Sequence, residues 1–234
     1  YAVLRVDKHT LYARGYAAMN FELMLSERLG MSREEVSARI PMLMIGLTGG
    51  LMSPHYTVFT RREVDAKPTG EKRLALGIKI PRVLKPEEYG SAVQARLVAE
   101  AVREAMKEAG IERVEDVCCV EVKCPNLTAA RLEDARSRGK KCCSTNFAEA
   151  GSKSKGASAL GVALGLGEVQ DADVTDEAVC SNWALYSNVA STSAGNEQVA
   201  CKVIVMGNSV NSVSKFKIGN GVMQDTLDIE GARE

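Results

Sequence analysis

The stretch SKSKGASALGVALGLGEV, residues 152–169, decides most of the expected fold. Small residues dominate one side of it, so we expect a helix that packs its backbone close to another element. β-Branched residues are frequent on either side of this stretch, at 117–123 and 199–206, which is typical of strands. Helices and strands alternate along the chain, and this order predicts a layered α/β architecture.

The remaining segments follow the same alternation. Ser32 and Glu35 have the spacing of a capping box, which predicts a short helix that ends before Pro41. The small residues STSAG at 191–195 predict a turn. The other expected helices cover 11–29, 85–109, 128–138 and 175–185, and the other expected strands cover 42–48, 56–60 and 73–80.

Composition excludes several classes of protein. With 45% hydrophobic and 26% charged residues, the 234-residue chain can bury a core, in which we expect Trp183 and Tyr186. The 30 basic residues balance 30 acidic ones, so a nucleic acid is not an expected partner. No apolar run approaches the roughly 20 residues of a membrane span, so no membrane partner is expected either.

The seven cysteines predict a reduced, cytoplasmic protein. Their number is odd, and the adjacent pairs at 118–119 and 142–143 are unusual in secreted disulfide frameworks. The sequence has no CxxC motif, and His9 and His55 lie far from the cysteines, so we favour free thiols over a metal site. A cysteine-centred zinc protein stays open as an alternative.

An internal repeat divides the chain. The matching segments are RGYAAM at 14–19 with KGASAL at 155–160, Ile45-Gly46 with Ser193-Ala194, and the basic strands expected at 72–80 and 215–223. These matches predict a partial first repeat at 1–64, a linker at 65–73, a complete second repeat at 74–210, and a linker with the start of a third repeat at 211–234. A chain that begins and ends inside repeats is expected to be a fragment or a degenerate relative.

Lys123 and Ser193 are the candidates for nucleophilic chemistry. Lys123 ends an apolar strand, where partial desolvation would lower the pKa of its amine and leave a neutral base. Ser193 precedes the backbone N–H groups of Ala194 and Gly195, which are candidate donors to an oxyanion. The two side chains would then form a Ser–Lys pair that attacks a carbonyl. Spacing alone leaves open the alternative that Lys123 is a solvated lysine at a strand end.

Two cations occupy matching places in the repeats. Arg14 and Lys155 each precede a glycine, and each is expected at the start of a helix. A cation is unfavourable at a helix N-terminus, so we expect both to bind an electron-rich group such as a ligand carbonyl. The alternative is that they are surface cations that pair with Glu22 or Glu149.

Five segments resemble the ring-opening amidohydrolase family of cyanuric acid hydrolase and barbiturase. They are MSPHYTVFTRR at 52–62, VKCPNLT at 122–128, ARSRG at 135–139, SKGASALGVAL at 154–164 and SNVASTSAG at 187–195. They occur in the family's order over nearly the whole chain after Leu11. The resemblance implies three repeats around a pseudo-threefold axis, with a central β-barrel wrapped by helices, of which this chain would hold an incomplete set.

The resemblance also implies roles for individual residues. The implied set is Lys123 with Ser193 as the catalytic pair, Ser193 with Ala194 on the scissile carbonyl, Arg14 on another substrate carbonyl, and Ile45, Gly46 and Lys155 as further substrate contacts. The family has serine at the position of Ile45 and arginine at that of Lys155. One hydroxyl contact is therefore absent, and one bidentate fork becomes a point charge.

The activity implied by the resemblance is hydrolysis of a cyclic imide-like ring. The preferred substrate is cyanuric acid, which yields carboxybiuret and then biuret and carbon dioxide. Barbituric acid, which yields ureidomalonate, is the alternative substrate, and an inactive chain that binds a partner through its repeat edge is the alternative function. The resemblance further implies a homotetramer, no cofactor in this chain, and a metal-binding loop in the part of the third repeat that follows Glu234.

Overall fold

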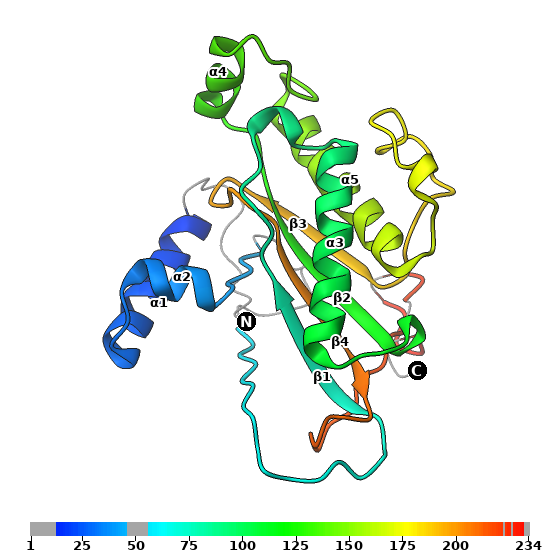
Figure 1. Ribbon diagram of the computed structural model, residues 1–234. Coiled ribbons are helices and arrows are strands. Elements are labelled where there is room, and N and C mark those ends of the chain that lie inside the picture. The colour runs from blue at the N-terminus through cyan, green and yellow to red at the C-terminus, as the bar shows by residue number, and fades with distance from the viewer. Residues whose placement is uncertain (1–12, 46–55, 222, 226, 232–234) are drawn as a thin grey trace. The chain divides into compact units, whose positions relative to one another are not determined.

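The computed structural model describes residues 13–45, 56–221, 223–225 and 227–231 (Figure 1). The chain divides into two compact units, one formed by residues 1–62 with 221–234 and the other by residues 63–220. None of the helices in the described ranges combines the length and the apolar character that a bilayer crossing requires.

The smaller unit contains two helices, α1 (Ala13–Leu29) and α2 (Arg33–Arg39). The predicted capping box is confirmed, because the Glu35 N–H donates to Ser32 Oγ (3.1 Å) and the Ser32 N–H donates to the Glu35 carboxylate (2.8 Å). The strands predicted at 42–48 and 56–60 are wrong where the structure describes them, since neither 42–45 nor 56–60 is a strand. Residues 56–60 are exposed, so their apolar side chains have no sheet to pack on.

The larger unit is built on a four-stranded sheet. In chain order its strands are β1 (Arg73–Lys79), β2 (Val117–Pro125), β3 (Ala190–Gly195) and β4 (Lys202–Ser209). Across the sheet the order is β1-β4-β2-β3, with β4 antiparallel to both of its neighbours and β2 parallel to β3. The helices α3 (Ala92–Ala109) and α5 (Phe147–Leu166) pack on one face of this sheet (Figure 1). The predicted α/β architecture is confirmed.

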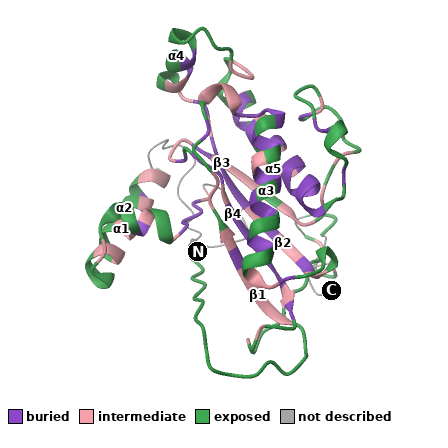
Figure 2. Ribbon diagram, in the orientation of Figure 1, coloured by how far each residue is buried: buried purple, intermediate pink, exposed green. Residues whose placement is uncertain are grey.

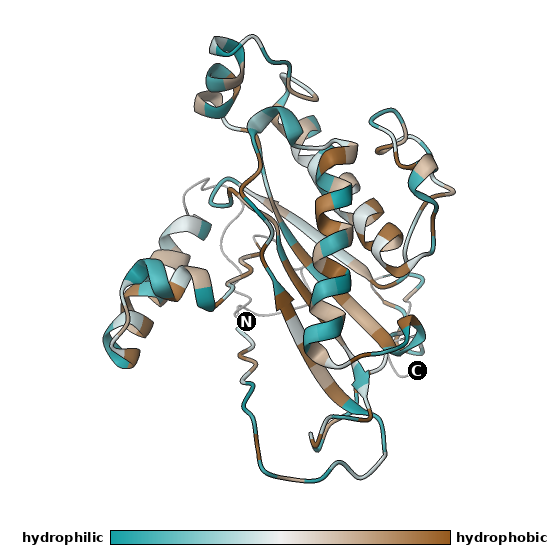
Figure 3. Cartoon of the chain, in the orientation of Figure 1, coloured by the Kyte–Doolittle hydropathy of each residue, from teal (hydrophilic) through white to brown (hydrophobic). Residues whose placement is uncertain are grey.

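The core lies between that face of the sheet and the two helices. Alternate residues of β2 and β4 point into it, because successive side chains of a strand face opposite ways. Four of them, Val120, Val122, Val203 and Val205, are fully buried. Figure 2 shows the buried positions along the strands and the facing sides of α3 and α5, and Figure 3 shows hydrophobic residues on the same elements.

The close packing predicted for the small-residue helix is confirmed. A Cβ added at Gly161 would lie 2.7 Å from Val98 Cβ, and a Cβ added at Gly165 would lie 3.0 Å from the carbonyl oxygen of Ala99. Both distances are shorter than ordinary contacts, so larger residues would push α5 away from α3. Glycine at these two positions lets the helix backbones approach each other.

Two predicted helices begin at other residues than expected. The Asn146 side chain accepts the N–H groups of residues 148 and 149, so α5 begins at Phe147 rather than at 152. Residues 86–88 form a separate 3-10 turn, and Gly90 follows it with a left-handed φ of 69°. The predicted helix at 85–109 therefore begins only at Ala92 and ends, as expected, at Gly110.

The helix predicted at 175–185 is wrong, because this segment is a series of turns. Cys180 adopts a left-handed φ of 59°, which interrupts a right-handed helix. The Asp176 carboxylate accepts the N–H of Ala92 (2.7 Å), so it caps α3 rather than a helix of its own. The two aromatic residues expected in the core are exposed instead, Trp183 at 81% and Tyr186 at 63%.

The remaining elements are short. The helix predicted at 128–138 is confirmed as α4 (Ala129–Ser137), with Thr128 as its N-cap. Further 3-10 turns cover 114–116 and 171–173. Residues 191–195 form strand β3 instead of the predicted turn, because they pair with β2 along their whole length.

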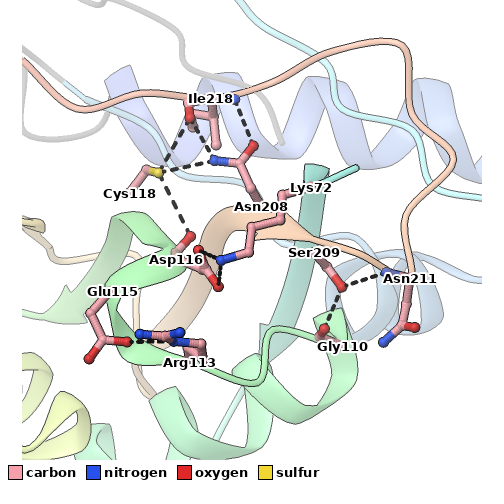
Figure 4. Close-up of polar contacts among 10 residues, drawn as sticks. All are labelled: Lys72, Gly110, Arg113, Glu115, Asp116, Cys118, Asn208, Ser209, Asn211 and Ile218. Atoms are coloured by element: carbon pink, nitrogen blue, oxygen red, sulfur yellow. Dashed lines mark hydrogen bonds and ion pairs between the residues drawn. The ribbon is translucent and has the colours of Figure 1, made fainter. Parts of the chain in front are cut away.

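Residues 212–220 cross the strands at one end of the sheet, with contacts to Leu74 of β1, Asn208 of β4 and Asn188 before β3. The Leu74 N–H donates to the Phe216 carbonyl (2.8 Å). The Asn208 side chain donates to the Ile218 carbonyl (2.8 Å) and accepts the Ile218 N–H (3.1 Å), as Figure 4 shows. The strand predicted at 215–223 is therefore wrong, because the described residues there form no strand. Side-chain contacts hold this segment instead.

Candidate functional site

The parallel pairing of β2 and β3 brings Lys123 and Ser193 together. The two residues are direct partners in the register, so their side chains lie on the same face of the sheet. Lys123 Nζ lies 2.9 Å from Ser193 Oγ. The lysine is fully buried and the serine is half-buried. This geometry fits a base that removes the proton of a serine hydroxyl.

A third side chain, that of Glu197, completes the cluster. The chain turns after β3, where the Gln198 N–H donates to the Gly195 carbonyl (3.2 Å), and the turn directs Glu197 back over the strand end. Glu197 Oε1 lies 3.5 Å from Lys123 Nζ, and the glutamate side chain is 12% exposed. A Cβ added at Gly195 would overlap this carboxylate, so glycine is required for Glu197 to lie there.

Other charged groups line the same face of the sheet. Glu121 lies two residues before Lys123 on β2, and Lys202 is the partner of Lys123 on β4. Burial raises the pKa of the Glu121 carboxyl, and a hydrogen bond from Ser191 and the charge of Lys123 oppose this shift. The site thus combines two acids and two lysines on a face opposite to the apolar core.

The neighbouring cysteines are poor competitors for the role of nucleophile. Cys124 follows Lys123 but points into the core, where burial raises the pKa of its thiol. Burial also raises the pKa of the Cys201 thiol well above its usual range. All seven cysteines are free in the structure, as predicted. Within the described residues, no group of three His, Cys, Asp or Glu side chains is placed to hold a metal ion.

The backbone at the end of β3 separates the two oxyanion candidates. The Asn126 N–H donates to the Gly195 carbonyl (3.0 Å), so the backbone groups of Gly195 face β2. Adjacent residues of a strand turn their backbone groups to opposite sides. The N–H of Ala194 therefore points to the outer edge of β3, away from the ladder with β2. Of the two candidates, Ala194 is the one whose N–H the ladder leaves for a ligand.

Arg131 on α4 joins the loops that follow β2 and β3. Its guanidinium donates to the carbonyl oxygens of Asn126 (2.5 Å) and Gln198 (2.7 Å). The same group lies over the Tyr89 ring, 5.8 Å from its centroid. One planar side chain thus fixes the spacing between the loop that follows Lys123 and the loop that carries Glu197.

We expect Arg131→Lys to lower the free energy of unfolding by about 1 to 3 kcal/mol, because an ammonium cannot span both carbonyls. The two loops should also become less rigid, since they lose their common anchor. Urea unfolding followed by circular dichroism measures the first effect. Arg136→Lys, the same change at an exposed position of α4, is the control, and equal stability of the two variants would contradict the clamp.

The other predicted site residues lie elsewhere. Arg14 is at the start of α1, as expected, and Ile45 belongs to the same smaller unit, while Gly46 lies outside the described residues. The expectation that Lys155 begins a helix is wrong, because α5 begins at Phe147 and places Lys155 in mid-helix, on an exposed side. The argument from the helix dipole therefore does not apply to Lys155. The suggested partners of these cations pair with other residues, Glu22 with Arg33 (3.2 Å) and Glu149 with Lys153 (3.7 Å).

Comparison with known families shows which proteins this chain is similar to. Residues 9–234 match the family described as amidohydrolase ring-opening protein. The chain belongs to this ring-opening amidohydrolase family. The resemblance carried by the five sequence segments is confirmed.

Members of the ring-opening amidohydrolase family are similar to the chain throughout its length. A cyanuric acid amidohydrolase of Bradyrhizobium diazoefficiens is 47% identical over 219 residues, which cover 93% of this chain and 59% of the relative. A cyclic amide hydrolase of Azorhizobium caulinodans is 43% identical over 223 residues, 95% of this chain and 61% of the relative. The chain thus spans about three fifths of the length of these curated relatives.

A solved structure of a ring-opening amidohydrolase has the same fold. It is described as "Cyanuric acid hydrolase: evolutionary innovation by structural concatenation", and it matches with a TM-score of 0.93 at 40% identity. The match covers 99% of this chain and 65% of the other. This coverage is consistent with the expected architecture of an incomplete set of repeats.

Sequence reasoning missed two residues of the site. Glu197 stands two residues after the SAG motif, and an isolated acid in a polar loop carries no signal of its own. Arg131 lies in an amphipathic helix with several other charges. Both contacts depend on how the ends of β2 and β3 come together, which the order of residues along the chain does not state.

Proposed function

We propose that this chain supplies the nucleophile and the base of a hydrolase that opens cyanuric acid. The observation that carries the proposal is the 2.9 Å contact between Lys123 Nζ and Ser193 Oγ, on a lysine that is fully buried. Membership of the ring-opening amidohydrolase family supports the choice of a cyclic amide as the substrate class.

The reaction begins with attack of Ser193 Oγ on a ring carbonyl carbon. Lys123 Nζ takes the hydroxyl proton as the new C–O bond forms, and the carbonyl oxygen becomes an oxyanion. The N–H of Ala194 is the donor that we assign to this oxygen. When the C–N bond breaks, the ring nitrogen receives the proton from Lys123. The product of this half-reaction is an open chain joined to Ser193 as a carbamate ester.

Water completes the reaction. Lys123 removes a proton from the attacking water, the ester C–O bond breaks, and Ser193 Oγ takes the proton back. The released acid is carboxybiuret, which loses carbon dioxide to give biuret. The same two residues thus act in both half-reactions, and the protein returns to its starting state.

The test is loss of cyanuric acid absorbance with the wild-type protein and with Ser193→Ala. We expect Ser193→Ala to reduce kcat by at least about 10³-fold, because the variant lacks the hydroxyl oxygen that lies 2.9 Å from Lys123 Nζ. Barbituric acid is assayed in parallel as the competing substrate. Turnover of cyanuric acid by Ser193→Ala at the wild-type rate would exclude the proposed nucleophile, and turnover of barbituric acid alone would reassign the substrate.

A further inference from the structure

The contact between Glu197 and Lys123 extends the site beyond a Ser–Lys pair. Glu197 Oε1 is 3.5 Å from Lys123 Nζ, and Ser193 Oγ is 2.9 Å from the same nitrogen. Lys123 therefore lies between a carboxylate and the hydroxyl that it would deprotonate. The arrangement has the order of a catalytic triad, in which an acid orients the base and the base faces the nucleophile.

The turn after β3 is shaped for this contact. Gly195 has no side chain that would displace the carboxylate, and the hydrogen bond from the Gln198 N–H to the Gly195 carbonyl closes the turn. The Glu197 side chain is 12% exposed and Lys123 is fully buried, so solvent screens their attraction little. Residues that are distant in the chain thus place an amine and a carboxylate together in a buried position.

The predicted repeat allows a comparison between its two copies. Ser193 corresponds to Ile45 in the first repeat, and Glu197 corresponds to Gly49, four residues after Ile45. The copy that has the serine hydroxyl also has the acid, and the copy that lacks the hydroxyl lacks the acid. This pairing is expected if the acid serves the reaction of the serine rather than the fold of the repeat.

We propose that Glu197 is a positioning residue that holds Lys123 toward Ser193 and stabilises the ammonium formed when Lys123 takes the serine proton. This inference rests on the proposed Ser–Lys function. The negative charge acts at the moment when positive charge develops on Nζ, so it lowers the barrier to attack more than it strengthens substrate binding. Two further charged groups of the described residues lie beside Lys123, Glu121 on its own strand and Lys202 on β4.

The test compares Glu197→Gln and Glu197→Asp with the wild-type protein. Glu197→Gln should lower kcat roughly 10- to 100-fold, because the ammonium formed on Lys123 loses the opposite charge beside it, and should leave KM within about twofold. Loss of the carboxylate disfavours the ammonium form of Lys123, so the rising limb of the pH–rate profile should move to lower pH by about 1 to 3 units. Glu197→Asp keeps the charge one methylene further away and should give intermediate values of both.

The controls separate this inference from the proposed function. Glu133→Gln, the same change at an exposed position of α4, should leave kcat and the pH profile unchanged. If Ser193→Ala is inactive and Glu197→Gln has wild-type kcat and pH profile, the role of Glu197 is refuted while the function stands. A lower kcat with an unchanged pH profile would also refute the role of Glu197. A purely structural role would lower kcat without moving the pH profile. If Glu197→Gln does not fold, the pH profile of Glu197→Asp decides in the same way.

Discussion

Lys123→Met is expected to abolish turnover and to destabilise the protein together. Removing a general base costs about 10²- to 10⁴-fold in rate, and methionine fills the same space without a basic nitrogen. The change also leaves the Glu197 carboxylate, 12% exposed, without its cation at 3.5 Å. Breaking a buried pair from one side costs about 3 to 5 kcal/mol, so the free energy of unfolding should fall by this order.

A double variant isolates the two effects. Lys123→Met combined with Glu197→Gln removes both charges, so most of the lost stability should return while turnover stays absent. Stability is measured by urea unfolding with circular dichroism, because Trp183 is 81% exposed and reports little on the core. A Lys123→Met protein with wild-type turnover would rule out Lys123 as the base. A single variant that is as stable as the double variant would argue against a buried ion pair.

Features that depend on neighbouring residues were predictable from the sequence. The capping box of Ser32 and Glu35 and the helix end at Gly110 each need only a few adjacent residues, and both are confirmed. The strand predicted at 117–123 is also confirmed as β2, because its side chains match a buried strand. These signals are local, so the rest of the fold does not change them.

Predictions failed where a distant segment changed the outcome. Thr175, Asp176 and Glu177 have the composition of a helix start, yet Asp176 caps α3 instead. The small residues of STSAG suggested a turn, but parallel pairing with β2 makes them strand β3. Both errors come from contacts between segments far apart in the chain, and local propensity does not contain such contacts.

The candidate site shows the same division. Local residue types and the family resemblance both singled out Lys123 and Ser193, which are 70 residues apart, but spacing alone gave little reason to bring them together. The register of β2 and β3 supplies that reason. The contact of Glu197 with Lys123 also requires a turn that folds back over a glycine. It could therefore be recognised only in the structure. The sequence thus indicates the type of chemistry, and strand pairing determines which residues lie close enough to act together.

A large loss of stability is also expected from Gly77→Ala. Gly77 is buried in β1, and a Cβ added there would overlap the carbonyl oxygen of Ala105 in α3, which is part of a helix backbone and cannot rotate away. α3 also packs against Gly161 of α5 on another side, so it cannot retreat from the sheet without disturbing that contact. Overpacking of this kind costs about 3 kcal/mol or more, measured by urea unfolding.

Gly15→Ala, the same change in α1 with nothing within 4 Å of the added Cβ, should instead be neutral or slightly stabilising. Equal stability of the two variants would show that β1 and α3 are not in close backbone contact.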